Sequence, residues 1–131
     1  MEKVYAENLT IELIHGSIMR MVWTGESTAE GVRAMIAFTN ACREQSEDVG
    51  RLAIIHAGDA TGMRRDARRE LIPYARTKPW ERVAFVGVGF QIRVLIDLLS
   101  RAFRSMGMDV AEVGFVDNEA EALAWLSAPS E

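Results

Sequence analysis

Three polar residues, His56, Asp59 and Thr61, follow a short apolar run and carry side chains that could do chemistry. The run begins at Leu52 and is typical of a buried strand that leads into a helix. If this strand lies inside a parallel sheet, the segment Gly58–Gly62 lies at its carboxyl end, where open α/β sheets place their binding sites. We therefore expect the functional residues to gather at this end of the strand.

His56 and Asp59 suggest acid–base chemistry, because histidine titrates near neutral pH and a carboxylate can orient its ring. A small hydrolase is one hypothesis that this pair supports. The sequence shows no evident nucleophile beside the pair. A hydrogen-bonded structural role for His56 is therefore the simpler interpretation.

Thr61 stands just before a predicted helix, and two interpretations are open for its hydroxyl group. A threonine at a helix start can accept a hydrogen bond from a backbone N–H, which stabilises the helix by about 1 kcal/mol. The same place attracts a phosphate, because free N–H groups and the helix dipole favour negative charge there. Arg64 and Arg65 follow within one turn and could pair with that phosphate.

Four arginines, Arg64, Arg65, Arg68 and Arg69, cluster on this predicted helix. The net charge of the chain is −4, which argues against general affinity for nucleic acid. From Arg64 to Arg82, however, seven basic residues stand against three acidic ones. The cluster is either a solvated helix face or a binding surface. Because a guanidinium group favours carboxylate and phosphate partners, the surface would bind an acidic protein or an anionic lipid head group.

Apolar periodicity and turn residues divide the chain into strands and helices that alternate after an N-terminal hairpin. Strands are predicted at residues 3–14, 18–23, 52–56, 83–88 and 110–116, and helices at 27–45, 64–74, 90–106 and 120–126. This order, β-β-α-β-α-β-α-β-α, predicts an α/β fold with a mixed, mostly parallel sheet, an antiparallel N-terminal hairpin and about four helices. The length fits a single domain over residues 1–131.

The predicted helix at 90–106 is apolar on more than one side. Such a helix is usually part of a core. If the sheet leaves one side uncovered, that side becomes a homodimer interface or a pocket for an apolar ligand. Gly107 fits the residue that ends the helix. Before the helix, Gly87-Val88-Gly89 lacks the third glycine of a dinucleotide-binding loop, so a plain turn and no cofactor are expected.

Cys42 is the only cysteine, and the sequence holds only two histidines, His15 and His56. Neither a disulfide nor a metal site is expected from this set, which fits a reducing compartment. No apolar run approaches the ~20 residues that span a bilayer, and the first residues lack the pattern of a secretory signal. We expect a soluble cytoplasmic protein that does not span a membrane.

Three segments resemble the anti-sigma-factor-antagonist-like branch of the STAS superfamily, which is grouped with the CRAL-TRIO lipid-transfer domains. They are Val22–Thr28 at the entry to the first helix, Pro79–Gly87 at the approach to a strand, and Phe115–Leu126 at the closing strand and helix. The resemblance covers nearly the whole chain. It implies the STAS-like mixed α/β fold.

The resemblance also bears on the segment Asp59–Met63. In the superfamily an Asp-Ser-Ser-Gly-Leu motif opens the second helix, and a partner kinase phosphorylates its second serine. The segment here reads Asp-Ala-Thr-Gly-Met. The similarity places Thr61 at the phosphoacceptor position.

The resemblance and the basic helix together predict a non-enzymatic regulatory module that binds a partner protein through the loop and helix after the central strand. The residues expected at the contact are Asp59, Thr61, Gly62, Arg64, Arg65, Arg68 and Arg69. The alternative is a carrier of a small apolar or lipid ligand, which the CRAL-TRIO kinship and the apolar helix at 90–106 favour. Either function is compatible with a homodimer.

Overall fold

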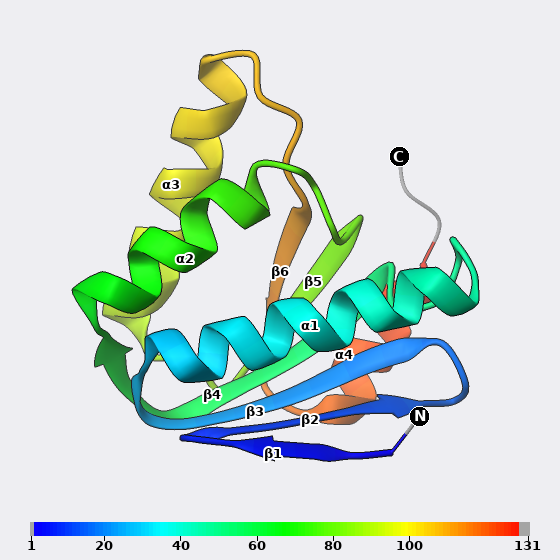
Figure 1. Ribbon diagram of the computed structural model, residues 1–131. Coiled ribbons are helices and arrows are strands. Elements are labelled where there is room, and N and C mark those ends of the chain that lie inside the picture. The colour runs from blue at the N-terminus through cyan, green and yellow to red at the C-terminus, as the bar shows by residue number, and fades with distance from the viewer. Residues whose placement is uncertain (1, 129–131) are drawn as a thin grey trace.

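The computed structural model describes residues 2–128, which form one six-stranded sheet and four helices (Figure 1). The strands lie in the sheet in chain order, with β1 and β6 at its two edges. The predicted α/β class, mostly parallel with an antiparallel N-terminal part, is confirmed. The elements are β1 (Val4–Ala6), β2 (Leu9–Ile14), β3 (Ile18–Ser27), α1 (Ala29–Gln45), β4 (Leu52–Met63), α2 (Arg65–Ala75), β5 (Arg82–Val86), α3 (Phe90–Ser105), β6 (Glu112–Val116) and α4 (Glu119–Ser127).

The first three strands run antiparallel. Residues 3–14 were expected to be one strand, but the chain turns at Asn8, which has a φ of 60°, and so forms β1 and β2. Asparagine tolerates this left-handed conformation better than most residues. Its side chain also donates a hydrogen bond of 2.7 Å to the backbone oxygen of Glu26. The second turn has positive φ at His15 and Gly16, as a tight hairpin with right-handed twist requires.

Strands β3 to β6 are parallel, and their side chains alternate between two apolar layers. On one face Met21, Ala53 and Val83 pack with α1 and α2. On the other face Ile54 and Ala84 pack with α4. Because β5 is covered on both faces, its apolar residues run without interruption, as is typical of a strand inside a parallel sheet.

Helix α1 supplies most of the helical part of the core. Thr28 caps it, because its side-chain oxygen accepts a hydrogen bond of 3.2 Å from the backbone N–H of Gly31. Seven of its residues are buried, Cys42 among them. Helix α2 lies beside it, joined by the ion pair between Arg33 and Glu70. This pair of helices covers the face formed by β2, β3 and β4 (Figure 1).

Strand β4 is longer than expected. The apolar run ends at His56, and a loop was predicted over Asp59–Gly62, but the backbone continues as strand to Met63. It pairs with β3, which extends to Ser27. The loop prediction is therefore wrong, because hydrogen bonding to a neighbouring strand maintains an extended backbone after the buried side chains have ended.

Helix α3 stands apart from the sheet in Figure 1 and contacts it mainly near β6. None of its residues is buried, and Phe90, Leu95 and Leu98 are among the large apolar side chains exposed to solvent. The interpretation of this helix as part of the core is therefore wrong. Its end is as predicted, since Gly107 has a φ of 80° and donates its N–H to the Arg104 carbonyl. Across residues 2–128 no helix is both long and apolar enough to span a bilayer.

Candidate functional site

The middle of β4 carries an extra residue relative to β3. Val22 pairs with His56 and Thr24 with Asp59, so three steps along β4 match two steps along β3. Side chains of residues that pair in register on neighbouring parallel strands point to the same face of the sheet. A β-bulge adds one residue to one strand, so the side chains that follow it point to the opposite face from the one that regular alternation would give. The bulge therefore places Asp59 on the same face as His56, three positions away, where regular alternation would put it on the opposite face.

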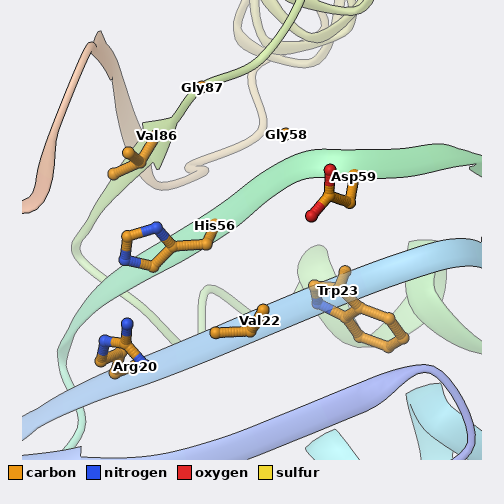
Figure 2. A pocket seen from close by; sticks show the side chains of 8 residues that line it. All are labelled: Arg20, Val22, Trp23, His56, Gly58, Asp59, Val86 and Gly87. Atoms are coloured by element: carbon orange, nitrogen blue, oxygen red, sulfur yellow. The ribbon is translucent and has the colours of Figure 1, made fainter.

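A hollow of about 270 Å³, which we call the edge hollow, lies at this bulge (Figure 2). It lies along the middle of β3 and β4, beside the carboxyl end of β5. Its lining residues are Arg20, Val22, Trp23, His56, Gly58, Asp59, Val86 and Gly87. Within residues 2–128 no cluster of three histidine, cysteine or acidic side chains is suited to hold a metal ion.

A carboxylate from α4 joins the two basic side chains of the edge hollow. The Nε2 atom of His56 lies 2.9 Å from Oε1 of Glu119, and Arg20 donates a hydrogen bond from Nε to the same oxygen. The hydrogen bonds from His56 and then from Arg20 hold the pKa of Glu119 below its usual value of 4.5. Strands β3 and β4 are thereby tied to the first turn of α4.

The structure gives the hydrogen-bond partner of His56. Its hydrogen-bond partner is Glu119 and not Asp59, which confirms that the ring is hydrogen-bonded. The eight residues that line the edge hollow include no serine, threonine or cysteine. The arrangement therefore offers a charged pocket, with no hydroxyl or thiol nucleophile among its lining side chains for the imidazole to activate.

Thr61 lies in β4 and is exposed. Gly25 pairs with Ala60 and Glu26 with Gly62, so Thr61 is the extra residue of a second bulge. The interpretation of Thr61 as the helix cap is wrong. The N-cap of α2 is Arg64, whose side chain makes no capping hydrogen bond.

The predicted arginine cluster lies on the outer side of α2. Arg64 is loosely paired, 3.9 Å from Glu26 and 3.6 Å from Asp66. Three further arginines surround two apolar residues in a shallow hollow of about 360 Å³, and we call this set the α2 surface: Arg65, Arg68, Arg69, Ile72 and Pro73. Pro73 lies in the last turn of α2, and the helix continues to Ala75.

The structure thus divides the predicted contact residues. Asp59 lines the edge hollow, whereas Arg65, Arg68 and Arg69 form the α2 surface, and Thr61 and Gly62 lie on the strand between them.

Two residues of the edge hollow network were missed by sequence reasoning, Arg20 and Glu119. For Arg20 the signal is that it is the single charge in the apolar run Ile18–Trp23. For Glu119 it is the closing motif Phe115–Leu126, in which this glutamate opens the last helix. Neither signal indicates which residues form the contact. Glu119 is 63 residues from His56 and 99 residues from Arg20 in the chain, so the fold alone brings them together.

Comparison with known proteins agrees with this architecture. The family model described as SpoIIAA-like matches residues 18–127. A DUF3478-family protein with a SpoIIAA-like fold from Shewanella loihica PV-4 is similar over 90% of this chain and 91% of its own, with 19% identity and a TM-score of 0.61. The anti-sigma factor antagonist SpoIIAA in its unphosphorylated form is similar over 88% and 94%, with 13% identity and a TM-score of 0.61.

No curated protein sequence matches the chain. At these identities the solved structures support the fold alone, and the family assignment depends on the family match. The matched region runs from β3 to the end of α4 and confirms the resemblance to the anti-sigma-factor-antagonist-like branch of the STAS superfamily. This chain belongs to the SpoIIAA-like family.

Proposed function

We propose that this protein is a non-enzymatic regulatory module that binds an acidic partner protein through the α2 surface. The SpoIIAA-like fold points to a regulatory module of the STAS type, and SpoIIAA itself is an anti-sigma factor antagonist. The observation that carries the proposal is the group of unpaired arginines on α2. In the part of the chain that the structure describes, Arg65, Arg68 and Arg69 make no ion pair or side-chain hydrogen bond.

The chemistry of the α2 surface fits a protein partner. A planar guanidinium group can donate two parallel hydrogen bonds to one carboxylate, so three arginines suit an acidic surface. Ile72 and Pro73 give the arginines an apolar centre. Protein interfaces commonly combine an apolar centre with a polar rim.

Phosphorylation of Thr61 stays part of the proposal. The hydroxyl is exposed and lies three residues before Arg64. A phosphate there would add about −1.5 to −2 charges at pH 7 beside the arginines. It would therefore weaken binding of an acidic partner.

The experiment compares two doubly substituted proteins. Arg68→Glu/Arg69→Glu reverses two charges of the α2 surface, and Arg101→Glu/Arg104→Glu reverses two charges on α3 as the matched control. Each protein is tagged, purified from its own host and analysed by quantitative mass spectrometry. We expect a stoichiometric partner with the unsubstituted chain and the α3 variant, and its loss with the α2 variant. Equal recovery with all three proteins would refute the α2 surface.

A second function, carriage of a small apolar or lipid ligand, is favoured by α3. Its exposed apolar residues are Phe90, Ile92, Val94, Leu95, Leu98 and Leu99. Native mass spectrometry of the protein purified from its host tests this function and the homodimer together. A carrier would show an added ligand mass that Leu95→Ser/Leu98→Ser removes, whereas a bare chain in both samples would exclude carriage.

A further inference from the structure

The edge hollow has more hydrogen-bond donors than its internal partner uses. In the Arg20 side chain only Nε forms a hydrogen bond, and in the His56 ring only Nε2 forms one; both contact Glu119. Among the described residues the terminal guanidinium nitrogens of Arg20 have no hydrogen-bond partner. Figure 2 shows both side chains at the hollow, on neighbouring strands. A guanidinium group with spare donors, beside an imidazole on the neighbouring strand, is an arrangement that receives an anion.

Glu119 is the carboxylate that these donors now hold, and the cap of its helix does not depend on it. Its side chain is 38% exposed. The N-terminus of α4 is capped by Asn118, whose side chain accepts a hydrogen bond of 2.9 Å from the N–H of Glu121. Glu121 in turn accepts a hydrogen bond from the backbone of Asp117. Glu119 can therefore turn away towards solvent while the helix stays capped.

We propose that the edge hollow binds a small ligand through a carboxylate or phosphate group, which Arg20 and His56 receive in the place that the Glu119 carboxylate occupies here. Glu119 then acts as an internal competitor that the ligand displaces. This site is separate from the α2 surface, so the proposal does not depend on the proposed function.

The rest of the edge hollow restricts the ligand. Val22 and Val86 give it apolar walls, and its volume of about 270 Å³ admits only a small molecule. Asp59 lies on the same face as His56 because of the bulge. Its carboxylate repels a second anionic group and can accept a hydrogen bond from a hydroxyl or an ammonium group. A small hydroxy or amino acid, or its phosphorylated counterpart, fits this distribution of charge.

The test is an NMR titration of the 15N-labelled protein at low ionic strength with two probes, inorganic phosphate and acetate. Saturable shifts are expected at the amides of Arg20, His56 and Gly58 with at least one probe, and the stronger probe identifies the anionic group. Glu119→Gln should lower the apparent dissociation constant about tenfold. If the Glu119 carboxylate occupies the site about nine-tenths of the time, only about one-tenth of the protein is free to bind the probe, and the apparent affinity is reduced about tenfold. Arg20→Gln should abolish the saturable shifts.

Arg33→Gln is the matched control, because Arg33 also pairs with a glutamate but lies on α1. It should bind as the unsubstituted chain does. Thermal unfolding of each variant shows whether it is folded, and His56→Gln provides a second test if Arg20→Gln is not. The proposal is overturned if neither probe gives saturable shifts in the unsubstituted chain or in Glu119→Gln. It is also overturned if Arg20→Gln and Arg33→Gln behave alike.

Discussion

Helices α1 and α3 have nearly the same length, follow parallel strands and carry an apolar side, yet they differ completely in burial. Helix α1 buries seven residues between the sheet and α2, whereas α3 buries none. Phe38 on α1 is 4% exposed, and Phe90 at the start of α3 is 79% exposed. The comparison teaches that apolar periodicity identifies the side of a helix that can be buried, but does not say whether the same chain buries it.

The difference also indicates which helix stabilises the fold and which helix has apolar surface available for binding. The core around α1 and α2 includes Trp23, Met35 and Trp80 and is completed without α3. An apolar helix that the core does not use is available for another molecule. The comparison between α1 and α3 therefore makes quantitative predictions about stability.

The largest effect is expected from Phe38→Ala in α1. Truncating a buried phenylalanine removes its transfer free energy and leaves a cavity, which should lower the free energy of unfolding by about 3–5 kcal/mol. Phe90→Ala in α3 is the control of the same residue type and should change it by less than about 0.5 kcal/mol. Urea denaturation measures both. Similar losses for the two variants would show that α3 is also part of the core.

The next largest effect concerns α4, which is shorter than α3 but closely packed. A Cβ atom at Gly114 would lie 2.6 Å from the Trp125 ring, so Gly114→Ala must displace this ring from its position against β6. We expect a loss of about 1–3 kcal/mol in the free energy of unfolding, measured by urea denaturation. Gly89→Ala at the start of α3, where nothing lies within 4 Å, is the control. An unchanged stability for Gly114→Ala would contradict the packing of Trp125.

A smaller effect is expected from the pH dependence of Glu119→Gln. Because the pKa of Glu119 is lowered in the folded state, its carboxylate stabilises the fold above the usual value of 4.5, and this contribution is lost as the pH falls through the folded pKa. The side chain is partly exposed, so the contribution is about 1 kcal/mol or less. The variant should be less stable at pH 6 and equal to the parent near pH 2. A difference that grows towards acid pH would contradict the role of Arg20 and His56.

The smallest effect on stability is expected from Leu98→Ser in α3. Leu98 is 57% exposed, so its replacement should change the free energy of unfolding by less than about 0.5 kcal/mol. Urea denaturation measures the free energy of unfolding. A marked loss of stability would mean that a neighbouring surface covers this residue.

The order of the elements could be predicted from local signals. The hydroxyl cap near Thr28 and the glycine at position 107 indicate where helices begin and end, and the uninterrupted apolar run of β5 indicates a strand covered on both faces. Each of these signals acts within a few residues. The order of these strands and helices along the chain then predicts the fold class.

The site could be predicted only in outline. The sequence directed attention to the residues that follow His56, but the bulges that orient Asp59 and Thr61 depend on the register with β3. Register is a property of two strands, so no pattern in one of them fixes it. The contact of His56 with Glu119 likewise joins residues 63 positions apart.

Native-state hydrogen exchange tests the central claim most directly, namely that α1 belongs to the core and α3 presents uncovered surface. Amides of residues 29–45 should exchange only through global unfolding, and those of residues 90–105 should exchange at least about a hundredfold faster through local opening. This result would leave α3 free to meet a partner or ligand. Equal protection of the two helices would show that α3 is covered, and would contradict the account.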